Sequence, residues 1–139
     1  MKKKISVLLM VLVMVLSATV TSYAAVGDEV LPYATDTISF LTNRISGTTA
    51  RSEIVVQFSD EVDEYSVVVY LQKLSNGSWV LDTTNPDYVF YNNGINAETF
   101  IFTNNYDSLT YGSTYRLMVV SRDIINGSEH RVTAYSNTF

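Results

Sequence analysis

The sequence predicts an all-β fold, an antiparallel β-sandwich of about seven or eight strands. Segments rich in Val, Ile, Tyr, Phe and Thr alternate with clusters of Asn, Gly, Ser and Asp at the spacing typical of sandwiches. A helical period of about 3.6 residues is hard to find in these segments. Asn-Gly pairs tolerate positive φ at both central positions of a tight turn, so we expect hairpin or loop tips at Asn76-Gly77, Asn93-Gly94 and Asn126-Gly127.

Residues 1–24 are predicted to form a helical secretory signal peptide. Three lysines precede an apolar run from Ile5 to Leu16, and the small residues Ser22 and Ala24 fit the positions before a cleavage site. The apolar run is shorter than the roughly twenty residues that cross a bilayer as a helix. We therefore expect cleavage after Ala24 and secretion of the remaining chain, with an uncleaved membrane anchor as the alternative.

Composition narrows the functional classes. Removal of the signal segment takes away three lysines and leaves six basic residues against fourteen acidic ones, a net charge of −8. Such a charge disfavours binding to nucleic acid and to anionic membrane surfaces. The chain has no cysteine and a single histidine, His130, so most thiol, zinc and catalytic-triad chemistry is excluded. We expect no enzymatic activity and no cofactor.

Residues 25–35 are interpreted as a lead-in segment and residues 36–139 as the β-sandwich domain. The segments with strand composition are Thr37–Asn43, Glu53–Phe58, Tyr65–Leu74, Ser78–Asp82, Tyr88–Tyr91, Thr99–Thr103, Tyr115–Arg122 and His130–Thr138. Alternation within them predicts inward-facing apolar sets, namely Ile54, Val56 and Phe58; Tyr65, Val67, Val69 and Leu71; Tyr115, Leu117 and Val119; and Val132 and Ala134.

The segment LTYGSTY contains the sharpest local motif. Leu109 lies six residues, and Gly112 three residues, before Tyr115. This spacing resembles the tyrosine corner of fibronectin type III and related immunoglobulin-like sandwiches. The resemblance implies that the chain crosses between two sheets here, where Gly permits the unusual backbone and the Tyr hydroxyl bonds to an upstream backbone group. The implied role of these residues is structural.

Three short motifs also resemble small secreted proteins of Gram-positive, Clostridia-like bacteria. They are LQK at Leu71–Lys73, NGSW at Asn76–Trp79 and Gly-x-x-Tyr-Arg at Gly112–Arg116. That resemblance implies a domain of unknown function, so it concerns the fold and adds no chemistry.

An outward face of the predicted sheet is unusually apolar and is the first candidate site. It comprises Val68, Tyr70, Met118, Val120, Thr133 and Tyr135, edged by Arg116, Arg122 and Arg131. Soluble proteins seldom expose large apolar patches, and Tyr, Met and Arg are typical of protein interfaces. Either this face binds a protein partner, or it is covered by the segment 82–97 or by the lead-in with Leu31 and Tyr33.

Aromatic residues suggest a second candidate site, a flat platform for sugar rings made by Trp79, Tyr88 and Tyr91. The alternative is that these rings belong to the core or to half-buried strand positions.

Acidic residues offer weaker candidates. Asp60, Glu61, Asp63 and Glu64 could collect a calcium ion but match no calcium loop, so a solvated turn is expected, and Asp82, Asn85 and Asp87 form a poorer set. A glycosidase pair of carboxylates has no specific support. His130 is expected to be a surface loop residue.

These observations together predict a secreted, non-enzymatic binding or structural module that contacts protein or cell-surface material. The alternative is a carbohydrate-binding module. The ligand and the oligomeric state are not specified by these residues.

Overall fold

The computed structural model describes residues 36–139, so the expected signal peptide (1–24) and lead-in (25–35) lie outside the described residues. Within residues 36–139 the protein is all-β and contains no helix. The strands are β1 (Thr37–Arg44), β2 (Ala50–Ser75), β3 (Ser78–Leu81), β4 (Val89–Tyr106), β5 (Tyr115–Ile125) and β6 (Ser128–Tyr135). Over this range there is accordingly no helix long and apolar enough to cross a membrane.

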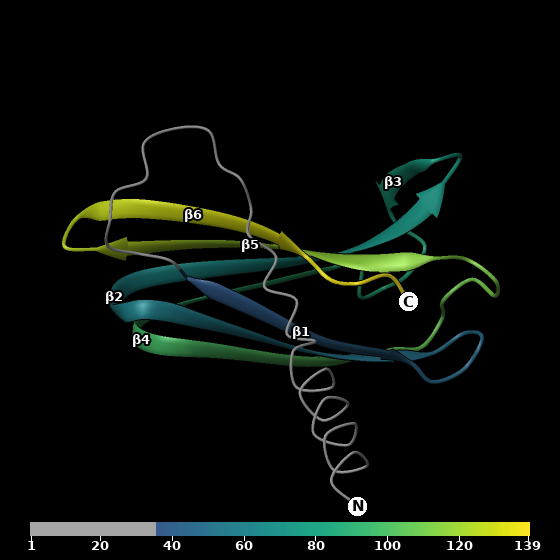
Figure 1. Ribbon diagram of the computed structural model, residues 1–139, viewed down its shortest axis with the longest axis horizontal. Helices are drawn as coiled ribbons and strands as arrows, with labels where there is room; N and C mark the ends of the chain where they lie inside the picture. The colour runs from purple at the N-terminus through teal and green to yellow at the C-terminus, as the bar shows by residue number, and fades with distance from the viewer. Residues whose placement is uncertain (1–35) are drawn as a thin grey trace, which may run out of the picture.

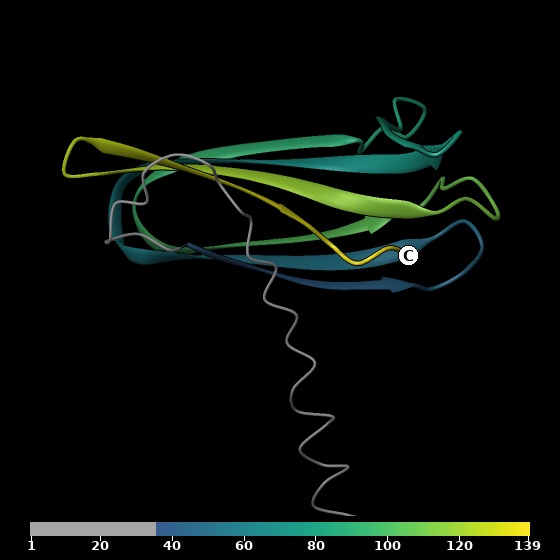
Figure 2. The same ribbon diagram turned by 45° about the horizontal axis from the view of Figure 1, so that its top comes forward.

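All six strands belong to one antiparallel sheet that curls until its two halves face each other (Figures 1 and 2). The first layer consists of β1, residues 50–57 of β2 and residues 99–106 of β4. The second layer consists of residues 62–75 of β2, residues 89–97 of β4, and β3, β5 and β6. The long strands β2 and β4 therefore pass through both layers and connect them covalently.

A register shift makes the bend in β2. The pairing of β2 with β4 is interrupted between Gln57 and Val62, which is the signature of a β-bulge. The buried positions of β2 are even from Ala50 to Val62 and odd from Val67 to Leu71, so side chains on both sides of the bend point into the same core. Burial confirms the predicted inward faces of β2: Ile54, Val56, Phe58, Val67, Val69 and Leu71 are all buried.

The number of strands differs from the expected seven or eight. The segments Glu53–Phe58 and Tyr65–Leu74 are two parts of β2, and Tyr91 and Thr99–Thr103 both lie in β4. The acidic stretch 60–64 was expected to be a turn between strands, but the main chain stays extended through it. A bulge can redirect a strand without ending it, and composition does not distinguish the two cases.

Two of the three Asn-Gly pairs form the predicted hairpin tips. Asn76-Gly77 joins β2 to β3 and Asn126-Gly127 joins β5 to β6, with positive φ at all four residues. The expected tip at Asn93-Gly94 is wrong, because this pair lies inside β4 opposite Ser66 and Tyr65. A Cβ on Gly94 would come within 2.6 Å of the Tyr65 ring, so the glycine is required here by close packing.

Aromatic rings fill the space between the layers. Phe90 of the second layer packs on Phe102 of the first, with ring centroids 4.1 Å apart. Tyr65 lies close to the bend and contacts both Phe58 and Phe100, at 5.4 and 5.9 Å between centroids. These contacts tie the two layers together at the aromatic distances typical of protein cores.

At the corner before β5, a buried tyrosine makes two hydrogen bonds through its hydroxyl group. The Tyr115 side chain is fully buried. Its hydroxyl accepts a hydrogen bond from the Thr110 backbone N–H at 2.9 Å and donates one to Asp82 Oδ2 at 3.0 Å. Gly112 has φ +71°, a backbone conformation that favours glycine, and Leu109 is buried.

Candidate functional site

The register of the second layer assembles the candidate interface. Directly opposed residues of antiparallel strands share one face of a sheet. One row runs Tyr91, Val68, Val120, Thr133 across four strands, and the next row runs Val89, Tyr70, Met118, Tyr135. The hairpin to β3 adds Leu81 opposite Gln72, and Trp79 opposite Leu74. We call the following set the outer face: Val68, Tyr70, Trp79, Leu81, Val89, Tyr91, Arg116, Met118, Val120, Thr133 and Tyr135.

The outer face combines exposed rings with half-buried aliphatic side chains. Tyr91 is 58% and Tyr135 is 42% exposed, whereas Val68 and Val120 between them are half-buried by their neighbours. The opposite surface, formed by the first layer, carries mainly polar side chains such as Arg51, Glu53, Gln57, Thr103 and Asn105. The first layer also exposes Leu41 and Ile101, so both surfaces carry apolar side chains, and the second layer presents the larger apolar set.

No described segment covers the outer face. Residues 89–97, which were considered as a cover, pair edge to edge with β2 and widen the face instead. Residues 82–88 turn back beside the corner, where Asp82 and Asn85 are buried. The other possible cover, the lead-in with Leu31 and Tyr33, lies outside the described residues.

Arg116 occupies a distinctive position on the outer face. Its guanidinium carbon lies 4.4 Å from the centroid of the Trp79 ring and 4.2 Å from that of Tyr135. Its Nε–H donates a hydrogen bond to Gln72 Oε1 at 2.8 Å, and the Gln72 amide contacts Met118 Sδ at 3.8 Å. Side chains from β2, β3, β5 and β6 thus hold one cation in a fixed orientation.

The other end of the outer face carries two more arginines. Arg122 and Arg131 are opposed across β5 and β6. Arg122 forms an ion pair with Glu129 at 2.7 Å, and this hydrogen bond lowers the pKa of Glu129 and raises that of Arg122. Both partners are exposed, so this pair contributes little to stability.

The structure does not bring the predicted sugar platform together. Trp79 and Tyr91 are on the outer face, but Tyr88 packs against the core. The Trp79 ring is also stacked on Arg116. Stacking of a sugar needs open ring faces on a common surface, which these three residues do not offer.

The predicted interface omitted four residues of the outer face and the neighbouring Gln72; the four are Trp79, Leu81, Val89 and Tyr91. The Asn76-Gly77 turn contained the signal for Leu81, because a two-residue hairpin fixes the register of the residues on either side. Val89 could not be placed, since the pairing of β4 with β2 is not encoded in a local turn.

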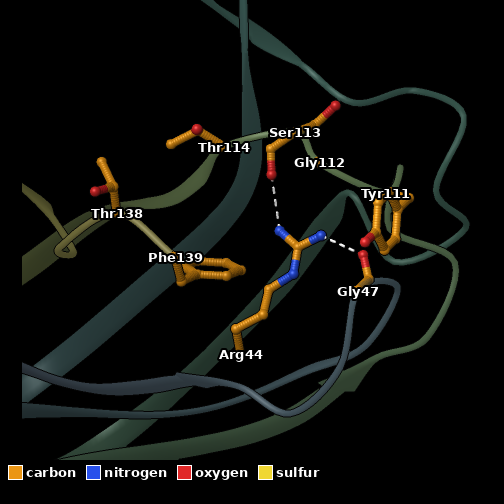
Figure 3. A pocket seen from close by; sticks show the side chains of 8 residues that line it. All are labelled: Arg44, Gly47, Tyr111, Gly112, Ser113, Thr114, Thr138 and Phe139. Atoms are coloured by element: carbon orange, nitrogen blue, oxygen red, sulfur yellow. Dashed lines mark hydrogen bonds between the residues drawn. The ribbon is translucent and has the colours of Figure 1, made fainter.

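A depression of about 500 Å³ lies at the edge of the corner (Figure 3). Arg44 projects into it and donates hydrogen bonds to the carbonyl oxygens of Ser46, Gly47, Thr110 and Ser113. The guanidinium therefore links the β1–β2 hairpin to the β4–β5 connection. Since these carbonyls engage all three of its nitrogens, we assign Arg44 a structural role.

The acidic candidates also have structural partners. Among residues 36–139, no group of three or more His, Asp or Glu side chains is placed to hold a metal ion. Asp63 Oδ2 accepts a hydrogen bond from the Asn126 backbone N–H at 2.8 Å, which ties the β2 bend to the β5–β6 turn. Asp82 accepts from Thr84 and Tyr115, and Asn85 Oδ1 accepts from the Asp87 backbone N–H.

A buried acidic cluster lies at the start of β1 and was not foreseen. Asp36 and Asp123 are both buried. The expectation that His130 is a surface loop residue is wrong, because His130 lies in β6 and its Nδ1 is 3.1 Å from Asp123 Oδ2. Burial, followed by the hydrogen bond and the charge of Asp123, raises the pKa of Asp36 from 3.8 to about 7. The period of two in β5 places Asp123 on the inner face with Tyr115, so this signal was present in the sequence.

Comparisons with models of protein families, with curated proteins and with solved structures find no match to this chain.

Proposed function

We propose that this protein is a secreted, non-enzymatic binding module with an immunoglobulin-like fold, and that its outer face binds another protein. The pairing of the strand segments supports the fold: β1, residues 50–57 of β2 and residues 99–106 of β4 form one layer, as strands A, B and E do in immunoglobulin-like sandwiches. Tyr115, whose hydroxyl accepts the hydrogen bond from Thr110, is the first residue of β5, the strand that corresponds to F.

The outer face, which no segment within residues 36–139 covers, is the observation that carries the function. It joins aromatic, methionine and arginine side chains in one continuous surface, which is the composition enriched at protein interfaces. It is built on regular strands rather than on loops, so it is already ordered before a partner docks. A protein partner fits this surface better than a glycan, because Tyr88 is turned into the core and Trp79 is stacked on Arg116.

The test compares two substitutions to aspartate on opposite surfaces. Tyr70→Asp places a charge at the centre of the outer face, and Thr103→Asp places the same charge on the polar surface of the first layer. We expect association of the purified protein with proteinaceous cell-surface material to be lost in Tyr70→Asp and kept in Thr103→Asp, with unchanged circular dichroism in both.

Treatment of the surface material distinguishes the partner class. Protease should abolish association and periodate, which oxidises sugars, should not. Equal association of both aspartate variants would refute the proposal, and sensitivity to periodate alone would identify a carbohydrate-binding module instead.

A further inference from the structure

Three neighbouring side chains hold the guanidinium of Arg116 in place, but its two Nη nitrogens have no partner among the described residues. The rings of Trp79 and Tyr135 flank it at 4.4 and 4.2 Å, and Gln72 accepts the hydrogen bond from its Nε–H. Within residues 36–139 no hydrogen bond or ion pair reaches its two Nη nitrogens. The N–H groups that remain form the planar fork that pairs with a carboxylate through two parallel hydrogen bonds.

The acidic residues of the outer surface are not placed to satisfy this fork. Glu129 is paired with Arg122, and Glu64 lies opposite Ile124 at the far end of β5. The chain as a whole is acidic, with a net charge of −5, and yet three arginines gather on this one surface. The charge of the outer face therefore complements an acidic partner and disfavours a second copy docked face to face.

The surroundings of Arg116 restrict the kind of anion. Arg122 and Arg131 lie at the other end of the face, so a single guanidinium is available at this position. One planar fork can pair with a single carboxylate through two parallel hydrogen bonds, and carboxylates are the anions that a protein partner carries on its Asp and Glu side chains. The neighbouring surface is formed by Tyr70, Met118 and Val89, which would contact apolar side chains.

We propose that Arg116, held between Trp79 and Tyr135, is a carboxylate seat that receives an aspartate or glutamate side chain of a partner protein, with apolar residues of the same partner segment packed on Tyr70 and Met118. This inference rests on the proposed function, since it specifies the chemistry of the partner that the outer face binds.

Trp79 provides a direct reporter, because it is the chain's single tryptophan and stacks on the proposed seat. The probe is a synthetic hexapeptide, Asp-Glu-Val-Leu-Pro-Tyr, with both ends blocked, which joins carboxylates to apolar side chains and reproduces residues 28–33 of this chain. The matched control peptide carries Asn and Gln in place of Asp and Glu. We expect a saturable change in Trp79 fluorescence with the acidic peptide, and at least tenfold weaker binding of the control peptide and at high salt.

Substitutions in the protein test the seat itself. Arg116→Gln should weaken binding of the acidic peptide at least tenfold, and Arg116→Lys should weaken it less because the charge is kept and the fork is lost. Arg51→Gln makes the same change in net charge on the opposite surface and should leave binding unchanged. Circular dichroism and the melting temperature verify that each variant is folded.

Several outcomes would overturn the proposal. These are no titration by the acidic peptide, equal binding of both peptides, or undiminished binding by Arg116→Gln. A titration that appears only after Asp28→Asn and Glu29→Gln are introduced would show that the chain's own acidic residues occupy the seat. Titration by polygalacturonate and not by the peptide would assign the seat to an acidic glycan.

The proposed function fails separately from the seat. Partner association that is lost in Tyr70→Asp but kept in Arg116→Gln would overturn the seat and leave the binding face intact. Association that survives both substitutions would overturn the proposed function.

Discussion

Asp36 is expected to make the protein less stable as the pH rises from about 4 to about 7. Its carboxyl group is buried against Asp123 of β5 and near His130 of β6, and it accepts a hydrogen bond from the Ser59 backbone N–H. The folded protein therefore holds a proton on Asp36 that the unfolded chain releases near pH 4. Because the folded pKa is the higher one, this contribution to stability is complete below the unfolded value and is lost as the pH passes through the folded value.

The magnitude follows from the two pKa values. A rise from 3.8 to about 7 corresponds to about 4 kcal/mol at about 1.4 kcal/mol per pH unit. Asp36→Asn replaces the protonated acid by a neutral amide that can still donate to Asp123. The variant should therefore resemble the natural protein near pH 4 and exceed its free energy of unfolding at pH 8 by up to about 4 kcal/mol.

Urea denaturation at several pH values between 4 and 8 measures this difference directly. Subtracting the curves removes the contributions of the ionisable groups that do not interact with Asp36, because both proteins share them. Asp107→Asn, the same change at an exposed position, is the control and should run parallel to the natural protein. If the Asp36→Asn and natural curves are parallel, or if their gap widens toward acid pH, the assignment of a buried shared proton is wrong.

Three further substitutions test the packing. Gly94→Ala should cost about 1–3 kcal/mol in thermal unfolding, because the added methyl meets the Tyr65 ring, and Tyr65→Leu in the same chain should recover most of the loss; a neutral Gly94→Ala would contradict this contact. Tyr115→Phe should cost about 1–3 kcal/mol because the buried Asp82 carboxylate and the Thr110 backbone N–H lose their hydrogen bonds, whereas Tyr111→Phe, at a position 82% exposed, should cost nothing measurable; equal effects would refute the structural role of the corner. Arg44→Met should lower the melting temperature and speed amide exchange in the loop at residues 107–114, and unchanged exchange there would show that its hydrogen bonds do not hold this loop.

The predictions from sequence succeeded where one local rule decided the structure. Alternation placed Val67, Val69 and Leu71 inside, and the Asn76-Gly77 and Asn126-Gly127 pairs formed their turns. These outcomes depend on neighbouring residues alone, so a single sequence contains the information.

The predictions from sequence failed where contacts between residues far apart in the chain determine the structure. Gly94 is needed because the ring of Tyr65 lies over it, and no local pattern indicates that contact. The stacking of Arg116 between Trp79 and Tyr135 depends on the pairing of four strands. The apolar character of the outer face was predictable from alternation, whereas the fixed orientation of its arginine was not.

The continuity of β2 has a consequence for motion. Its 26 residues run without interruption from the polar surface of the first layer to the centre of the outer face. An opening of the two layers at the bend would separate the aromatic rings packed between them, such as Phe90 and Phe102, and expose the buried core. The domain should behave as one cooperative unit in amide exchange. A partner that binds the outer face would therefore contact a surface whose backbone changes little on binding.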